Sequence, residues 1–278
     1  MFKSIDEVQK LSKDQLDAVR GNANIKLQQA PKGSIFYVSL NQKNPTLAKP
    51  EVREALKWLT DYASIEESLL RGLYVVHQAF LPKGFLGAVE EKPYKFDLAK
   101  AKALLAKAGV PDGFNVTMDV RNSFPTNDIA QAIQANWAKA GVKVELIPGD
   151  GKQVLTKYRA RNHDIYIGSW GPDYQDPHTN AETFAMNVDN TDAAKSKTLA
   201  WRNSWDIPDM TKQTQAAVLE RDAKKRAEMY QAIQREHQRL SPFIIMFQQT
   251  EVAARSKDVD GFVMGPSFEN NLYAGIKK

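Results

Sequence analysis

Residues 114–169 alternate between short apolar runs and helical patterns, and this alternation restricts the fold more than any other feature of the sequence. Apolar runs at 114–120, 142–147 and 165–169 are separated by helical patterns at 128–140 and 154–160. Strands that follow one another through a helix run parallel, because the helix carries the chain back across the sheet. The sequence therefore predicts an α/β fold with a mixed, mostly parallel sheet and helices on its faces.

Further strands and helices are expected on both sides of this unit. Pro31 and Gly33 indicate a turn between strands at 25–27 and 35–40. Residues 73–96 are irregular and contain two prolines and two glycines, so they are expected to form the longest loop. The remaining predicted elements are a helix that begins at Pro50, a helix started by a capping box at Ser64, a helix capped by Asp97, helices at 210–219 and 223–240, and a strand at 243–247.

Composition and charge exclude several classes of protein. The chain has no cysteine, which rules out a disulfide scaffold, thiolate metal sites and a cysteine nucleophile. Its net charge is +5, but Lys and Arg are scattered along helices and mixed with Asp and Glu, so a solvated surface is favoured and no nucleic-acid partner is expected. The four histidines at 77, 163, 178 and 237 lack metal-ligand spacing, so no metal and no other cofactor is expected.

The first six residues do not read as a secretory signal. Met1 to Asp6 contain neither an apolar core nor a small-residue cleavage site, and no apolar run in the chain approaches the length of a membrane span. Two readings remain, a cytosolic protein or an internal piece of something longer.

The loop that follows the last predicted parallel strand is where a ligand is expected, because ligands bind beyond the carboxyl ends of parallel strands. This loop, residues 170–180, contains Trp170 and Tyr174, whose rings are flat apolar surfaces suited to a ligand. We expect at least one of the two rings to pack under the loop. Asp173 is a charged residue of this loop, and its structural alternative is to cap the turn; His77 and Arg121 are candidates in other loops that can face a ligand.

The string W-x-x-D-Y-x-D-P, Trp170 to Pro177, resembles a segment of family 5 solute-binding proteins, which include dipeptide-, oligopeptide- and nickel-binding members. The likeness continues in order along nearly the whole chain. It includes Leu40-Asn41 with Val52-Arg53-Glu54-Ala55-Leu56, Tyr94 to Gly109 (Y-x-x-D-x-x-K-A-x-x-L-L-x-x-A-G), Asp112-Gly113-Phe114, and the closing Val259-Asp260-Gly261-Phe262.

The resemblance implies a lobe of the type II periplasmic-binding-protein fold. Family members have two lobes joined by a hinge, and they are longer than this chain. The match implies that residues 39–241 are the carboxy-terminal ligand-binding lobe, that residues 1–38 are a remnant of the first lobe and a hinge strand, and that residues 242–278 return through the hinge. One wall of the cleft is thus present.

The resemblance also implies a function, the substrate-binding component of an ABC importer. Such a protein is periplasmic or held at the cell surface, is expected to be a monomer, and captures a peptide-like or other amine-bearing solute for a membrane permease. In peptide-binding relatives the Asp at the place of Asp173 pairs with the α-amino group of the ligand. The alternative function is the ligand-sensing domain of a cytosolic transcriptional regulator.

An enzyme is not expected. Asp173 and Asp176 are neighbours on one loop, whereas carboxylates that act as an acid–base pair face each other across a cleft. A carboxylate-dependent hydrolase is therefore only a third reading. Asp176-Pro177 is expected to be structural, fixing the exit of the loop.

Overall fold

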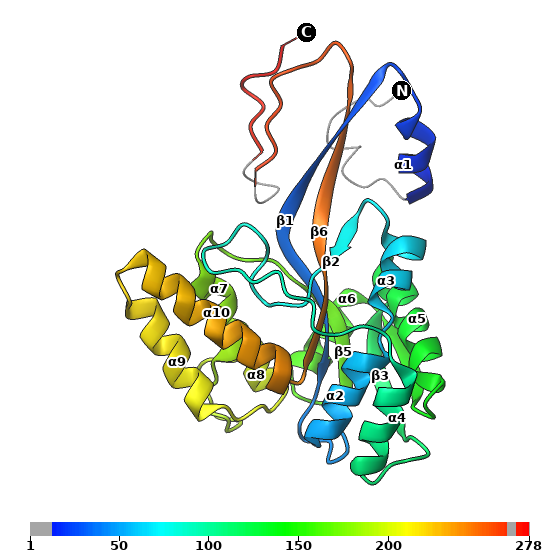
Figure 1. Ribbon diagram of the computed structural model, residues 1–278, viewed down its shortest axis with the longest axis vertical. Helices are drawn as coiled ribbons and strands as arrows, with labels where there is room; N and C mark the ends of the chain where they lie inside the picture. Colours follow the sequence, from blue (N-terminus) through cyan, green and yellow to red (C-terminus); the bar gives the residue numbers. More distant parts are fainter. Residues whose placement is uncertain (1–12, 266–270, 278) are drawn as a thin grey trace.

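A sheet of six strands organises the chain in the computed structural model, which describes residues 13–265 and 271–277. The strand order is β2-β6-β1-β5-β3-β4 (Figure 1). The strands are β1 (Ile25–Leu40), β2 (Tyr74–Val76), β3 (Asn115–Arg121), β4 (Lys143–Gly149), β5 (Ile165–Trp170) and β6 (Phe243–Ser256).

The parallel part of the sheet is the predicted βαβαβ unit. Strand β3 pairs in parallel with both β4 and β5, and the connections are α5 (Thr126–Ala138) and α6 (Gly151–Arg159). The other three pairings, β1 with β5, β1 with β6 and β2 with β6, are antiparallel. The sheet is thus mixed, as predicted, but parallel pairing is a smaller share of it than expected, because β1, β2 and β6 lie outside the repeating unit.

Helices cover both faces of the sheet and enclose two cores. Successive side chains of a strand point to opposite faces, so Phe36 and Val38 of β1 enter one core while Ile35 and Tyr37 enter the other. The first core is closed by α2 (Pro50–Leu59), α3 (Tyr62–Ile65) with the π-helix Glu66–Leu70, α4 (Leu98–Lys107) and α5. The second is closed by α6, α7 (Pro177–Ala185), α8 (Leu199–Arg202), α9 (Pro208–Leu219) and α10 (Ala223–Leu240).

Most predicted helix starts are observed, with two differences. Asp97 caps α4 by accepting a hydrogen bond from the Lys100 amide, and Pro50 begins α2. The helix expected from Ser64 begins instead at Tyr62, because Asp61 is the cap and accepts from the Ser64 amide. Helices α7 and α8 were not predicted. For α7, Asp176 is the extended N-cap residue and Pro177 is the first residue of the helix.

The two amino-terminal strands expected at 25–27 and 35–40 are one continuous strand. The register of β1 against β6 shifts between Pro31 and Ile35, so the expected turn is a β-bulge. The chain stays extended there because β6 pairs with β1 on both sides of the irregularity, from Ile25 to Pro31 and again from Ile35. Strand β6 accordingly continues well beyond its predicted end at Phe247.

The outer halves of β1 and β6 form a two-stranded ribbon that leaves the body of the molecule (Figure 1). Helix α1 (Lys13–Arg20) and the carboxy-terminal segment lie alongside this ribbon. The predicted boundaries at 38/39 and 241/242 lie close to the end of β1 and the start of β6, which are the ends of these strands inside the body. The division into lobes remains a prediction. No helix in the described ranges is long and apolar enough to cross a membrane.

A buried ion pair joins the ribbon to the carboxy-terminal segment. Lys32 in β1 and Glu251 in β6 are 1% and 2% exposed and form a salt bridge. The Lys32 ammonium also donates to the Gly265 carbonyl at 2.6 Å and to Asn271 Oδ1 at 3.1 Å. Asn271 Nδ2 in turn donates to Glu251 Oε1 at 3.1 Å. Both charges are therefore satisfied by groups from three separate segments.

Lys57 of α2 is a second buried lysine, 2% exposed. Its Nζ donates to the Gln238 carbonyl of α10 at 2.8 Å and lies 5.5 Å from the centre of the Tyr94 ring. Desolvation lowers the pKa of Lys57 from 10.5 to about 7. The unfolded chain therefore binds one more proton than the folded chain between these two values, and the free energy of unfolding rises with pH across that interval.

Lys57→Met should make the protein more stable at neutral pH by about 1–4 kcal/mol and flatten this rise, because the variant no longer buries an ammonium group. The Gln238 carbonyl keeps a donor in the variant, since the Tyr94 hydroxyl also donates to it at 3.1 Å. Urea denaturation between about pH 7 and pH 9.5 measures both effects. Lys195→Met, at an exposed site, is the control. A Lys57→Met variant with the pH slope of the parent would contradict the prediction.

The bulge in β1 brings Gly33 directly against Pro172, in the loop after β5. A Cβ atom on Gly33 would lie 2.6 Å from Cγ of Pro172, a rigid ring that cannot turn aside. Gly33→Ala should therefore displace the loop and destabilise the protein by about 1–3 kcal/mol. Gly171→Ala is the matched control, because its Cβ would meet nothing within 4 Å.

Urea denaturation together with amide hydrogen exchange of residues 171–176 distinguishes the two variants. We expect lower stability and faster exchange for Gly33→Ala, and no loss for Gly171→Ala. Equal behaviour of the two variants would show that the contact with Pro172 does not restrain the loop.

Candidate functional site

The carboxyl ends of the three parallel strands lie together at the end of the sheet where the ribbon enters the body. Arg121 at the end of β3 is opposite Gly149 at the end of β4. Trp170 at the end of β5 is opposite Ile35 of β1, which is in turn opposite Gln248 of β6. The loop expected to hold the ligand thus lies beside both the ribbon and the end of β3.

This loop, residues 171–176, is called the motif loop below, and it is held at three points. Pro172 packs against Gly33 of β1. The Asp173 amide donates to Thr179 Oγ1, in the first turn of α7, at 3.1 Å. At the end of the loop the Asp176 carboxylate accepts from the His178 amide at 2.8 Å and so caps α7.

Asp173 is exposed, and within the described part of the chain its carboxylate makes no hydrogen bond and no ion pair. The alternative role foreseen for it, capping the turn, belongs to Asp176 instead. Asp173 therefore combines a restrained backbone with a free negative charge. This is the arrangement that a contact to a cationic group requires.

Asp176 has a structural role, as expected, and it has two sets of partners. Besides capping α7, it receives two hydrogen bonds from the Arg226 guanidinium of α10, both at 2.8 Å. Partial burial disfavours the charged carboxylate, but the hydrogen bonds from Arg226 and from the His178 amide outweigh it and lower the pKa of Asp176. The group stays ionised, and its charge is used inside the protein.

Of the two aromatic candidates, one packs under the loop and one faces outward. Trp170 is half-buried against the second core, and its indole N–H is buried with no acceptor among the described residues. Tyr174 is 51% exposed. Desolvation and the neighbouring carboxylates of Glu182, Asp176 and Asp173 raise the pKa of Tyr174. Tyr174 is therefore the ring that is available as a flat wall next to Asp173.

Arg121 lies at the same edge of the sheet, at the end of the strand next to β5. Its guanidinium packs over Gly151, the first residue of α6, where a larger residue would displace it. The side chain is exposed, and no carboxylate pairs with it in the described ranges. Among the described residues, this end of the sheet therefore carries the unpaired Asp173 carboxylate, in the loop after β5, and the unpaired Arg121 guanidinium, at the end of the neighbouring strand β3.

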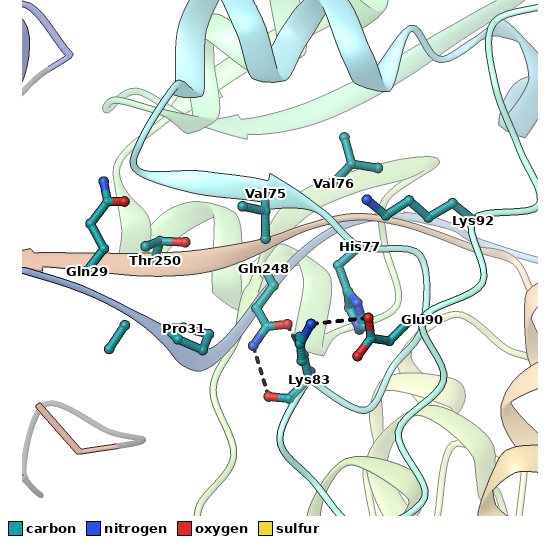
Figure 2. A pocket seen from close by; sticks show the side chains of 11 residues that line it. Gln29, Pro31, Val75, Val76, His77, Lys83, Glu90, Lys92, Gln248 and Thr250 are labelled. Atoms are coloured by element: carbon teal, nitrogen blue, oxygen red, sulfur yellow. Dashed lines mark hydrogen bonds and ion pairs between the residues drawn. The ribbon is translucent and has the colours of Figure 1, made fainter.

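His77 is not brought together with these residues. It follows β2 at the opposite end of the strand order and lines a cavity of about 350 Å³ beside the ribbon (Figure 2). Only 5% of it is exposed, its Nε2 lies 2.8 Å from the Leu81 carbonyl oxygen, and burial lowers its pKa. The cavity is lined by Gln29, Ala30, Pro31, Val75, Val76, His77, Lys83, Glu90, Lys92, Gln248 and Thr250.

A second hollow, of about 240 Å³, connects the ribbon with the motif loop. Gln175 of the loop lines it together with Gly33, Lys83 and Phe85. Gln175 and Lys83 were not singled out from the sequence. Gln175 stands two residues from Asp173, but Lys83 lies about ninety positions away in a loop with no distinguishing pattern. In the described ranges no group of three His, Cys, Asp or Glu residues is arranged to hold a metal ion.

Comparison with solved structures identifies the same architecture elsewhere. HbpA2 from Haemophilus parasuis superposes with a TM-score of 0.84 at 26% identity, over 95% of this chain and 52% of that one. The dipeptide binding protein from Pseudoalteromonas sp. SM9913, in complex with Met-Leu, superposes with a TM-score of 0.79 at 22% identity, over 96% of this chain and 52% of that one. At that identity the second likeness concerns the fold alone.

Sequence comparison points in the same direction. The dipeptide-binding protein of Pseudomonas aeruginosa is 26% identical over 269 residues, which are 94% of this chain and 49% of the relative. The glutathione-binding protein GsiB of Escherichia coli is 23% identical over 273 residues, 92% of this chain and 51% of the relative. The chain thus spans about half the length of these relatives. The family model for bacterial extracellular solute-binding proteins, family 5 (middle), matches residues 3–192, more than half of the chain. The chain therefore belongs to the family 5 bacterial extracellular solute-binding proteins.

Proposed function

We propose that this chain supplies one wall of the binding cleft of a non-enzymatic solute-binding protein that captures short peptides for the membrane permease of an ABC importer. The observation that carries the proposal is the free carboxylate of Asp173 on a loop whose backbone is held at three points. Relatives named for dipeptides and glutathione support the substrate class. The protein works outside the cytoplasm in this proposal, and one relative is named a periplasmic protein.

The charges at the sheet edge suit a zwitterion. A short peptide has an ammonium group at one end and a carboxylate at the other. Asp173 would accept hydrogen bonds from the ammonium group, and Arg121 would pair with the carboxylate, each as a charge-assisted contact. The exposed ring of Tyr174 would cover the peptide backbone or its first side chain. A solute with only one of the two charges would form only one of these two charged contacts.

The second wall of the cleft would come from the other lobe, as in a protein of twice this length. Closure of two lobes about the β1–β6 ribbon would exclude water and strengthen both charged contacts. With one wall exposed to solvent, these contacts are screened and worth little. We therefore expect the 278-residue chain by itself to bind dipeptides weakly but measurably, with a dissociation constant of about 1–10 mM.

Titration of the isotope-labelled 278-residue chain with Ala-Ala, followed by NMR, tests the proposal, because chemical-shift changes detect weak binding residue by residue. The amides of Gly171, of residues 173–176 and of Arg121 should shift with increasing peptide. N-acetyl-Ala-Ala, which lacks the ammonium group, should produce smaller shifts at the motif loop at the same concentration. Asp173→Asn should abolish the difference between the two peptides.

Asp112→Asn, at an exposed site in a turn on the same lobe, is the matched control and should titrate like the parent. Shifts confined to other surfaces, or shifts at the motif loop that Asp173→Asn leaves unchanged, would contradict the proposed site. Tight binding of Ala-Ala by the chain alone would contradict the need for a second wall.

A further inference from the structure

We propose that Arg226 is the positioning residue of the motif loop, because it holds Asp176 and thereby the backbone from which Asp173 meets the ligand. This inference deepens the proposed function and rests on it. Arg226 lies in the first turns of α10, fifty positions after Asp176, and it does not belong to the motif that carries the resemblance. Its side chain acts through Asp176 and is not proposed to touch the ligand.

The contact between Arg226 and Asp176 is bidentate. Nη1 donates to Oδ2 and Nη2 donates to Oδ1, each at 2.8 Å, so the two planar groups face each other edge to edge. The side chains are 17% and 34% exposed, so bulk water screens the pair less than it screens a surface pair. A pair of this geometry restrains direction as well as distance, because rotation of either group breaks one of the two bonds.

Arg226 is itself fixed by a contact with the neighbouring helix α9 and by a contact within α10. Its Nε donates to the Ala217 carbonyl of α9 at 3.3 Å, and its guanidinium carbon lies 5.4 Å from the centre of the Tyr230 ring. The guanidinium is therefore held on α10 and α9 before it meets the loop. It is a rigid support for Asp176 rather than a flexible surface charge.

Asp176 passes this restraint on to the motif loop. Its amide donates to the Tyr174 carbonyl at 3.0 Å, and its carboxylate caps α7 through the His178 amide. The same helix provides Thr179 for the Asp173 amide. With Pro172 resting on Gly33 at the other end, the six-residue loop is braced against β1 on one side and against α10 on the other.

Two substitutions separate positioning from charge. Arg226→Lys keeps the positive charge but cannot form two parallel hydrogen bonds to one carboxylate. Asp176→Asn weakens the same contact but keeps a good N-cap for α7, so the helix start is preserved. Arg235→Lys is the matched control. Arg235 lies on the same helix and pairs with Glu91 at 2.7 Å, but that pair is half exposed and does not contact the loop.

Amide hydrogen exchange of the 278-residue chain without ligand is the first measurement. Arg226→Lys and Asp176→Asn should both raise exchange in residues 171–176 at least about threefold, while exchange in the body of α10 stays close to that of the parent. Arg235→Lys should change neither. Unchanged exchange in the loop overturns the inference, and so does a rise spread evenly over α7, α9 and α10, which would mean a general loss of stability.

The affinity for Ala-Ala, measured by the NMR titration, is the second measurement. Both variants should weaken binding at least about threefold, and Arg235→Lys should not. A looser motif loop with unchanged affinity overturns the inference, because the brace would then not serve the ligand. A parent chain that fails to bind Ala-Ala contradicts the proposed function instead, while the exchange result by itself decides whether Arg226 holds the loop.

Discussion

The pairing of β1 with β6 is the interaction on which the rest of the structure depends. The two strands come from opposite ends of the chain, lie next to each other in the sheet with the βαβαβ unit on one side of them, and continue beyond the body as a ribbon. At the bulge the regular ladder is interrupted, and there the Lys32–Glu251 pair is buried. Removing two charges from water is costly, and the hydrogen bonds from Lys32 to Gly265 and Asn271 and from Asn271 to Glu251 help to offset this cost. The ribbon and the carboxy-terminal segment are therefore held together as one structural unit.

This pairing also sets the position of the candidate site. Ile35 of β1 pairs with Trp170, and Gly33 packs against Pro172. Strand β1 therefore both forms the ribbon and contacts the motif loop. A change in the direction of the ribbon would thus first displace the bulge and the motif loop beside it. Gln248 adds to this coupling, since its side chain bonds to the Lys32 carbonyl and to the Lys83 amide. In the proposed function the ribbon acts as a hinge, and the motif loop lies at its base.

The sequence predicts the regular parts of this fold because they follow from local periodicity and local caps. The βαβαβ unit, α4 with Asp97, and α10 from Ala223 to Leu240 are all of this kind. The parts it does not predict depend on distant partners. The segment around Pro31 and Gly33 has the composition of a turn, and it is a bulge only because β6 pairs on both sides of it. The bounds of β6 likewise follow from the length of β1 rather than from its own apolar run.

The same distinction explains the site, where two carboxylates three positions apart have opposite roles. Sequence alone assigns Asp173 and Asp176 to one loop, but the division of roles between them follows from where the other partners lie. Arg226 and an amide in the first turn of α7 bind the carboxylate of Asp176, whereas no group in the described ranges binds the carboxylate of Asp173. A ligand that met a mobile Asp173 would lose affinity in ordering it, typically about 0.5–1.5 kcal/mol for a flexible side chain and more for a loop. Because the bidentate contact to Asp176 already orders the loop in the folded protein, ligand binding does not have to supply the free energy of ordering it. In the proposed cleft, the free energy left for binding would then be set mainly by how well a second wall excludes water from the pair between the ligand's ammonium group and Asp173.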